Sequence, residues 1–204
     1  MLTLVSRSPR RRELLESTGI AFRVVAPEGE ESSLAAASVS AAARPRYADM
    51  VRRAALAKAR SAAGRASGLL LGADTIVVCD GSVLGKPADA DDTRRMLRRL
   101  SGRWHRVYTG LALVSGARHM MGYECTKVCF RPLAKKEIDW YIGTGEPTDK
   151  AGAYAIQGRG AVFVRAVEGC YTNVIGLPLP KLMEMLAAFK RGARTSHRSR
   201  RGAS

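Results

Sequence analysis

Short apolar runs and amphipathic stretches alternate along the chain from its first residues. Leu2–Ser6 predicts a buried strand, and after the turn at Ser8-Pro9 the run RRRELLEST predicts a helix that stops at Gly19. Ile20–Ala26 alternates well enough for a second strand, and Tyr47–Arg60 has apolar residues at helical spacing. The first part of the chain therefore predicts strand, helix, strand and helix in that order.

A longer apolar run, LLLGADTIVVC at Leu69–Cys79, predicts a buried strand with Asp74 and Thr75 in its middle. An ionised carboxylate in such a place is unfavourable unless a cation or hydrogen-bond donors accompany it. Asp74 is therefore the first candidate for a functional residue.

The rest of the chain continues to mix helices and strands. Asp80-Gly81 indicates a hairpin turn, and Asp89–Leu100 predicts a helix with acids at its start and arginines at its end, which we interpret as a solvated face. Further strands are expected at His105–Val114, Gly122–Phe130 and Ala161–Val167, and further helices at Ala134–Ile142 and Pro180–Arg191. This interleaving without an internal repeat predicts an α/β protein with a mixed sheet, forming one domain or two lobes that share a core.

The chain is strongly basic, with 34 Lys and Arg against 18 Asp and Glu, a net charge of +16 and a pI of about 10.5. Six of these excess charges lie in the acid-free segment 190–204, which we expect to be a disordered tail. Charge alone does not distinguish nucleic acid from a single triphosphate. Aromatic residues are only 6% and do not interleave with basic residues, so nucleic-acid binding is expected only weakly, through the tail if at all.

No membrane helix and no secretory signal are expected. The longest apolar run, around Ile175–Leu179, is far shorter than the ~20 residues that span a bilayer, and arginines from Arg7 onward follow the first apolar residues closely. The four cysteines are expected to be reduced side chains rather than zinc ligands: Cys79, Cys125, Cys129 and Cys170. These features predict a cytoplasmic protein.

The segment Ser6–Arg11 (SRSPRR) joins the first strand to the first helix. Free backbone N–H groups at the helix start, the positive end of its dipole, two hydroxyls and the guanidiniums of the arginines suit a phosphate. A simpler interpretation is a helix N-cap with exposed arginines. The segment alone leaves both open.

Other segments add carboxylates and cations that together would suit Mg²⁺ and a polyphosphate. Some have a simpler explanation alone: Lys58 as a surface charge, Lys86 as the residue before a proline, and Glu30-Glu31 as an exposed turn. The set comprises Asp74, Lys58, Lys86, the pair Glu30-Glu31 and the segment from Asp149 to Gly158.

Several well-known catalytic motifs are missing from the sequence. The Gly-rich run DKAGAYAIQGRG lacks the P-loop spacing, and no GxGxxG follows a strand, so Walker-type kinases and Rossmann cofactors are not indicated. His105, His119 and His197 form no evident Ser-His-Asp set, and we expect His105 to be structural. Metal-assisted attack of water on a phosphoanhydride is the chemistry that remains.

Six ordered segments resemble the Maf family of nucleoside triphosphate pyrophosphatases, also called septum formation proteins. The resemblance implies an elongated, two-lobed α/β fold similar to the inosine triphosphatase folds, with a mixed sheet and a central cleft, commonly as a homodimer. It covers about Leu2 to Leu186, so we expect a catalytic domain at 1–189 and a basic tail at 190–204. The segments are SRSPRRRELL, GADTIVV, GKP, LSGRWHRVYTG, EPTDKAGAYAIQG and VIGLPL.

Within that family, SPRR, ADT and IQG mark the type that acts on dTTP and UTP, whereas the 7-methyl-GTP type looks like SPWR, SDQ and SEG. Arg10, Thr75 and Gln157 match the dTTP/UTP type, as substrate-specificity positions. The Gln157 amide both donates and accepts, which suits the O2, N3–H and O4 groups of a pyrimidine. A cationic methylated purine would favour an aromatic face and a carboxylate.

The resemblance also implies roles for the remaining site residues. Asp74 is the expected proton acceptor, and Glu31 and Asp149 would join it in holding Mg²⁺ or Mn²⁺. The expected phosphate-binding residues are Ser8, Arg11, Lys58, Lys86 and Lys150. Arg7 departs from the family pattern, which usually has a small residue there, and is expected to crowd or extend the phosphate site.

The implied reaction is hydrolysis of dTTP or UTP to the monophosphate and pyrophosphate, with water attacking the α-phosphorus. Asp74 would orient and deprotonate that water, directly or through the metal. Two alternatives stay open: a 7-methyl-GTP pyrophosphatase, and a basic factor that binds nucleic acid or a partner on the same scaffold.

Overall fold

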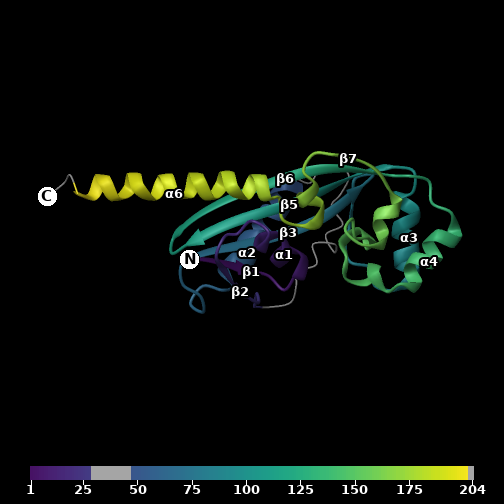
Figure 1. Cartoon of the computed structure of the whole chain (residues 1–204), viewed down its shortest axis with the longest axis horizontal. Coiled ribbons are helices and arrows are strands. Elements are labelled where there is room, and N and C mark those ends of the chain that lie inside the picture. Colours follow the sequence, from purple (N-terminus) through teal and green to yellow (C-terminus); the bar gives the residue numbers. More distant parts are fainter. Residues whose placement is uncertain (29–46, 202–204) are drawn as a thin grey trace.

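The structure is a computed structural model that describes residues 1–28 and 47–201, with side chains described as far as Gly192. The molecule is elongated, and three long strands run along it (Figure 1). These are β3 (Leu69–Cys79), β5 (Trp104–Ser115) and β6 (Arg118–Phe130).

All the strands belong to one seven-stranded sheet, in the order β2-β1-β3-β5-β6-β7 with β4 on β3. β1 (Leu2–Val5) is parallel to both β2 (Phe22–Val25) and β3, and the other pairs are antiparallel. The remaining short strands are β4 (Ser82–Leu84) and β7 (Val164–Glu168). The mixed sheet confirms the α/β class that the sequence predicts.

One edge of β3 is shared by two short strands that leave a gap between them. β1 pairs with β3 as far as Gly72, and β4 pairs with it from Val77 onward, whereas β5 pairs along the whole interval on the other edge. Among the described residues, Ala73–Ile76 therefore have no strand partner on the first side. Asp74 and Thr75 lie in this gap.

Helix α2 (Tyr47–Arg60) packs on one face of the sheet against β3 and β5. Two glycines allow an unusually close approach. A Cβ at Gly72 would lie 2.1 Å from the carbonyl oxygen of Ala55, and a Cβ at Gly110 would lie 2.1 Å from that of Val51. Glycine at these two strand positions thus lets the helix backbone rest on the sheet.

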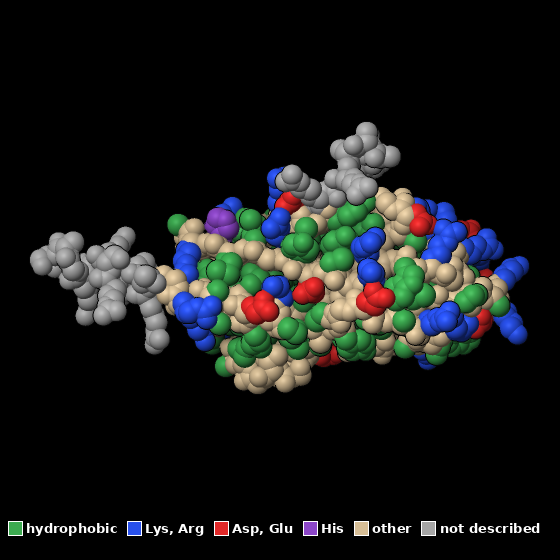
Figure 2. Space-filling model, turned by 90° about the horizontal axis from the view of Figure 1, so that it is seen from above, with side chains coloured by type: hydrophobic (Ala, Val, Ile, Leu, Met, Phe, Trp, Pro, Cys, Tyr) green, Lys and Arg blue, Asp and Glu red, His purple; other side chains and the backbone are tan. Residues whose placement is uncertain are grey.

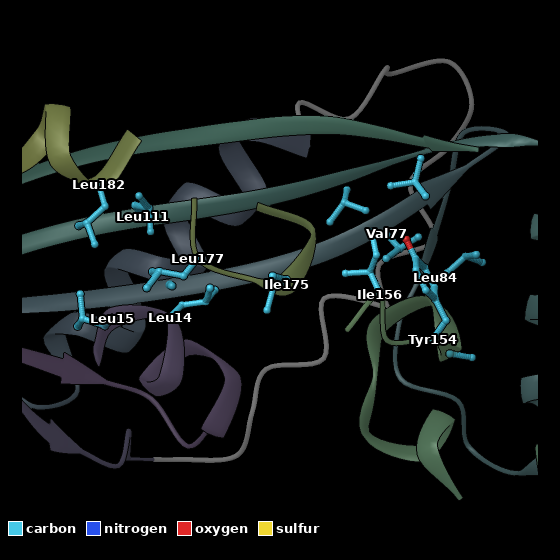
Figure 3. Close-up of a cluster of buried hydrophobic side chains, with 14 of the residues drawn as sticks. Leu14, Leu15, Val77, Leu84, Leu111, Tyr154, Ile156, Ile175, Leu177 and Leu182 are labelled. Atoms are coloured by element: carbon cyan, nitrogen blue, oxygen red, sulfur yellow. The ribbon is translucent and has the colours of Figure 1, made fainter. Parts of the chain in front are cut away.

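The opposite face of the sheet carries the largest hydrophobic cluster. Helices α1 (Pro9–Glu16) and α6 (Leu179–Arg201) cover one end of it, with the short α5 (Tyr171–Ile175) between them and the middle of the molecule. Figure 3 shows leucines of α1 and α6 at one end of the cluster and Val77 and Leu84 at the other. The cluster therefore joins the two ends of the molecule.

The second lobe lies at the far end of the long strands (Figure 1). It comprises α3 (Ala90–Leu100), α4 (Lys135–Gly143) and three 3₁₀ segments, η2 (Glu146–Asp149), η3 (Ala151–Ala153) and η4 (Arg159–Phe163). Asp89 caps α3 by accepting a hydrogen bond from the next turn, as its acidic start predicts.

The hairpin expected at Asp80-Gly81 is confirmed, and both residues have the positive φ of a type I′ turn, 48° and 75°. The strand expected at Ala161–Val167 begins later, at Val164. Arg159–Phe163 instead form the 3₁₀ segment η4, in which the Ala161 N–H donates to the carbonyl of Gly158 at 3.1 Å rather than to a neighbouring strand.

A disordered tail was expected at 190–204. In the part of this segment that the structure describes, helix α6 continues to Arg201. No proline follows Pro180, so nothing in the sequence blocks the helix. None of the described helices is both long enough and apolar enough to span a membrane.

Candidate active site

A cavity of about 590 Å³ opens where the edge of β3 is uncovered. The turn after β1, the middle of β3, the turn after β4 and the segment 149–157 all contribute to it. Ten of the predicted site residues line it: Ser8, Arg10, Arg11, Lys58, Asp74, Thr75, Lys86, Asp149, Lys150 and Gln157. The remaining one, Glu31, lies outside the described residues.

Asp74 is buried, with 6% of its surface exposed, and is paired with a cation as its position requires. The Nζ atom of Lys58 lies 2.6 Å from Oδ1 of Asp74. Asp74 is two residues after Gly72 on β3, so both face α2. Because the helix rests so closely on Gly72, Lys58 in its last turn reaches the carboxylate.

The Ser8–Arg11 turn caps α1 and lines the cavity at the same time. The Ser8 hydroxyl oxygen accepts a hydrogen bond from the Arg11 backbone N–H at 3.4 Å, and the Ser6 hydroxyl oxygen accepts one from the Ser8 N–H at 3.1 Å. The N-cap interpretation is therefore correct, and it does not exclude a phosphate at the same helix start. Arg7 lines the cavity too, and its guanidinium donates to the carbonyl of Pro27 at 3.2 Å.

Arg11 is held by a chain of hydrogen bonds that passes through Thr75. Its Nε donates to the carbonyl of Gly176 at 2.8 Å, and its Nη2 donates to the Thr75 hydroxyl at 3.0 Å. The Thr75 hydroxyl lies 2.9 Å from that of Thr109, which donates to the carbonyl of Asn173 at 3.1 Å. Thr75 thus orients a cation at the cavity wall.

The 149–157 segment supplies an ion pair and a free amide. Asp149 and Lys150 form an ion pair. Burial acts to raise the pKa of Asp149, but the pairing with Lys150 and the charge of Arg10 outweigh it, so this pKa lies below its ordinary value. The side-chain amide of Gln157 has no hydrogen-bond partner among the described residues, and it is exposed at the cavity.

One wall of the cavity is apolar. Val77, Leu84, Tyr154, Ile156 and Ile175 line it, and Figure 3 shows Val77, Leu84, Tyr154 and Ile156 gathered together. The cavity therefore has a cationic part, with Lys58, Lys86 and the Ser8–Arg11 turn, and an apolar part formed by these five side chains. Its volume lies within the range of small-molecule sites.

A family model described as "Maf-like protein" matches residues 1–189. The chain belongs to the Maf family. Three relatives named "dTTP/UTP pyrophosphatase" are similar over nearly their whole length. That of Symbiobacterium thermophilum is 51% identical over 92% of this chain and 93% of its own, that of Moorella thermoacetica 50% over 92% and 94%, and that of Bacillus cytotoxicus 47% over 93% and 96%.

In this Maf chain, the described residues contain no group of three or more His, Cys, Asp or Glu side chains placed to hold a metal. Two of the three predicted ligands, Asp74 and Asp149, line the cavity, and each is paired with a lysine. The four cysteines have free thiols, in agreement with their expected reduced state.

On the face of this Maf chain drawn in Figure 2, basic and acidic side chains of the described residues are interspersed. On the face drawn in Figure 2, Lys and Arg side chains gather at the end that holds α3 and α4, with acidic side chains among them. Several arginines of this lobe form ion pairs, for example Arg94 with Asp139 at 3.0 Å and Arg103 with Asp80 at 2.6 Å. Much of the basic charge on this lobe is therefore locally compensated.

Sequence reasoning missed several residues that shape the site. Thr109 stands opposite Thr75 only because of the β3–β5 register, and the Asn173 side chain donates to the carbonyl of Val107 at 2.9 Å from a helix that no periodicity indicates. Further omissions are Tyr141, Glu146 and Tyr154. A polar residue within an apolar run was the available signal, and only Asp74 was singled out by it.

Proposed function

We propose that this protein hydrolyses dTTP and UTP to the nucleoside monophosphate and pyrophosphate. The observation that carries the proposal is the buried Asp74–Lys58 pair, because it lies in the same cavity as Arg10, Thr75 and Gln157. Membership of the Maf family and the printed names of the three relatives support the same activity.

The chemistry follows from the two parts of the cavity. The triphosphate would occupy the cationic part, where Lys58, Lys86 and the Ser8–Arg11 turn stabilise the leaving pyrophosphate. Asp74 would orient the attacking water and accept its proton as the bond between the α- and β-phosphates breaks. Water supplies the oxygen added to the monophosphate, and pyrophosphate leaves.

The cavity fits a divalent cation such as Mg²⁺ or Mn²⁺. Asp74 and Asp149 offer hard carboxylate oxygens, and Mg²⁺ is commonly held by one or two carboxylates together with substrate phosphates. Glu31 is the third predicted ligand. When bound, the cation would neutralise phosphate charge. Lys58 and Lys150 would hold the same carboxylates when it is absent.

Base selection is assigned to the apolar part. A pyrimidine would lie against Tyr154 and Ile156, with the unpartnered amide of Gln157 available to its O4 and N3–H edge. A cationic 7-methylguanine has no exposed aromatic and carboxylate pair at positions 10 and 157 to receive it, since these are Arg and Gln.

The test is a panel of dTTP, UTP, CTP, GTP and 7-methyl-GTP with Mg²⁺ or Mn²⁺, measuring both pyrophosphate and orthophosphate. We expect dTTP and UTP to have the highest kcat/KM and to yield the monophosphate and pyrophosphate. Preference for 7-methyl-GTP, or release of orthophosphate and a diphosphate, would overturn the proposal.

The assembly, the location and the C-terminal segment stay predictions. We propose a homodimer in the cytoplasm, with residues 1–189 sufficient for hydrolysis and segment 190–204 giving at most weak affinity for nucleic acid. Light scattering tests the dimer. Deleting residues 191–204 should leave pyrophosphate release unchanged and remove any RNA binding, whereas RNA binding that persists would assign the affinity to residues 1–190.

A further inference from the structure

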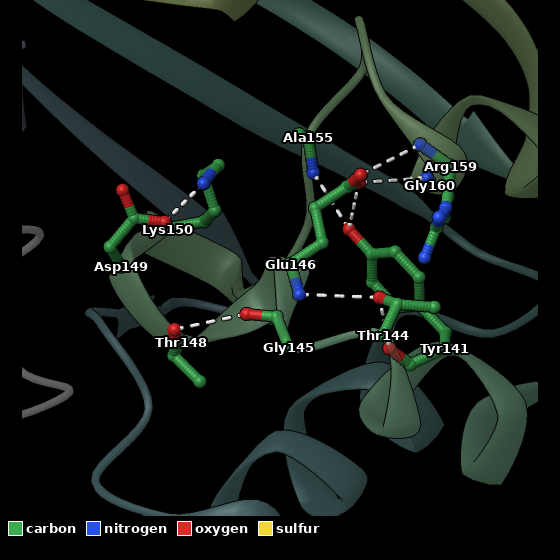
Figure 4. A network of polar contacts seen from close by, with 10 residues as sticks. All are labelled: Tyr141, Thr144, Gly145, Glu146, Thr148, Asp149, Lys150, Ala155, Arg159 and Gly160. Carbon is green, nitrogen blue, oxygen red and sulfur yellow. Dashed lines mark hydrogen bonds and ion pairs between the residues drawn. The ribbon is translucent and has the colours of Figure 1, made fainter. Parts of the chain in front are cut away.

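The loop that carries Gln157 is held on both sides by two side chains, the buried Tyr141 and the partly exposed Glu146 (Figure 4). Before Gln157, the Ala155 N–H donates to the Tyr141 hydroxyl at 3.1 Å. After it, the N–H groups of Arg159 and Gly160 donate to the Glu146 carboxylate at 2.9 and 3.1 Å.

The two anchors are joined to each other. The Tyr141 hydroxyl donates to Oε1 of Glu146 at 2.7 Å, and Tyr141 is fully buried with no exposed surface. Glu146 is fixed in turn, because its own N–H donates to the Thr144 hydroxyl at 3.2 Å. One phenol and one carboxylate therefore receive three backbone N–H groups of a single loop.

Two glycines of the loop lie so close to this pair that neither position has room for a side chain. A Cβ at Gly158 would lie 2.3 Å from Oε2 of Glu146, and a Cβ at Gly160 would lie 2.8 Å from the Tyr141 hydroxyl. The loop glycines therefore allow the backbone to close around the carboxylate. Gln157, directly before Gly158, lines the cavity.

The carboxylate is built to stay ionised. Burial acts to raise the pKa of Glu146, but the hydrogen bonds from Tyr141, Arg159 and Gly160 outweigh it and the pKa lies below its ordinary value. An ionised carboxylate can accept from all three donors, the Tyr141 hydroxyl and the N–H groups of Arg159 and Gly160. A neutral amide at this position would offer only one oxygen and would turn an NH₂ group toward backbone donors.

We propose that Glu146 and Tyr141 are positioning residues that fix the Gln157 amide for recognition of the pyrimidine base. This inference rests on the proposed function. Neither residue lines the cavity, so they act through the loop and not on the substrate. Asp74 and Lys58 belong to the other part of the site, so the chemical step is expected to depend little on this anchor.

The test uses two variants of the full chain, Glu146→Gln and Tyr141→Phe, which keep the size of each side chain. The matched control is Glu137→Gln. Glu137 also accepts three hydrogen bonds, two from the Arg131 guanidinium at 3.1 and 2.6 Å and one from the Ala134 N–H at 2.8 Å, but it does not contact the Gln157 loop.

For both variants we expect KM for dTTP to rise about tenfold and the preference for dTTP over CTP to fall about tenfold, with kcat within about threefold of wild type. The control should change neither KM nor preference. Amide hydrogen exchange should accelerate at Ala155, Arg159 and Gly160 in the Glu146→Gln protein. A uniform fall in kcat for all nucleotides, or an unchanged preference, would overturn the proposal.

A double-mutant cycle with Gln157→Ala separates positioning from general stability. If Glu146 acts through Gln157, the Glu146→Gln change should have almost no further effect on preference once the amide is gone. Equal effects in both backgrounds would contradict the inference. Should wild type itself fail to prefer dTTP and UTP, the proposed function fails first, whereas faster exchange in the loop would still test the anchor.

Discussion

The Nζ atom of Lys58 and Oδ1 of Asp74 are 2.6 Å apart, although Lys58 is on a helix and Asp74 is in the middle of a strand. Both side chains are largely buried, with 15% and 9% of their side-chain surfaces exposed. A pair so shielded from water interacts more strongly than a surface pair, and removing one partner leaves the other charge uncompensated.

Lys58→Met is therefore expected to reduce kcat/KM for dTTP by about 100-fold, because the cation serves both the carboxylate and the substrate phosphates. Steady-state pyrophosphate release measures this. The matched control is Lys181→Met, which breaks a Lys–Glu pair of the same 2.6 Å length outside the cavity. Comparable losses in both proteins would mean that Lys58 has no special role.

Gly72→Ala is expected to destabilise the protein by about 2 kcal/mol or more and to lower activity. The added Cβ would lie 2.1 Å from a backbone oxygen of α2, so the helix must move away from β3 and carry Lys58 from Asp74. Chemical denaturation gives the stability. Gly143→Ala is the control, since its Cβ would enter open space, and it should change stability by less than about 0.5 kcal/mol.

The combined exchange Arg10→Trp, Thr75→Gln and Gln157→Glu is expected to lower kcat/KM for dTTP by at least about 100-fold and to raise that for 7-methyl-GTP. A carboxylate at position 157 would repel the O4 of a pyrimidine, and loss of the Thr75 hydroxyl removes the 3.0 Å contact that orients Arg11. Competition assays with both nucleotides measure the switch. Arg12→Trp, on the exposed side of the same helix, should leave selectivity unchanged; if it reproduces the effect, position 10 does not set specificity.

The sequence predicted the fold well where side-chain periodicity and turn chemistry decide it. Tyr47–Arg60 and Leu69–Cys79 have the predicted bounds. Small apolar residues at helical spacing indicate the first, and a run rich in β-branched residues indicates the second. The start of the strand predicted at Ala161–Val167 was wrong, because Arg159–Phe163 form a 3₁₀ segment that a tertiary contact with Glu146 holds at its first residue. No local pattern reports such a contact.

The sequence named ten residues that the structure brings to one cavity, but it did not predict the hydrogen bonds that connect them. Asp74 stood out as a charge within an apolar run, and its partner Lys58 follows from α2 lying on the sheet. The link from Arg11 through Thr75 to Thr109 depends on strand register, and the Tyr141–Glu146 anchor depends on how three 3₁₀ segments fold together. Both arise from packing between distant segments, which single-sequence patterns do not encode.

His105 gives the protein a predicted pH dependence of stability. It is buried against Phe130 and Tyr154, with Nε2 2.9 Å from the Tyr154 hydroxyl, and burial lowers its pKa from 6.5 to about 4. Above pH 6.5 it is neutral whether folded or unfolded. Between pH 6.5 and 4 only the unfolded chain takes up the proton, so stability falls as pH falls, by about 3 kcal/mol in all.

Denaturation curves at pH 7.5, 6 and 4.5 test this dependence. His105→Gln should flatten it over that range, and His119→Gln, an exposed histidine on β6, should not. Three carboxylates also have lowered pKa values: Glu146, Asp149, and Glu137, whose pKa the Arg131 hydrogen bonds lower to about 2. Their contributions to stability fade only as the pH falls below their ordinary pKa values near 4. Equal pH slopes for wild type and His105→Gln would contradict the assignment.

The role of Asp74 as proton acceptor is tested most directly by the turnover of dTTP by the Asp74→Asn protein. The affinity of the same protein for the nucleotide is measured by calorimetry. We expect kcat to fall by about 100-fold or more while the dissociation constant stays within about threefold, because the amide keeps the shape of the carboxylate but does not accept the proton of water. Asp139→Asn, whose carboxylate pairs with Arg94 outside the cavity, should leave both values unchanged. Near wild-type turnover by the Asp74→Asn protein would contradict the role of Asp74 and, with it, the catalytic interpretation of the cavity.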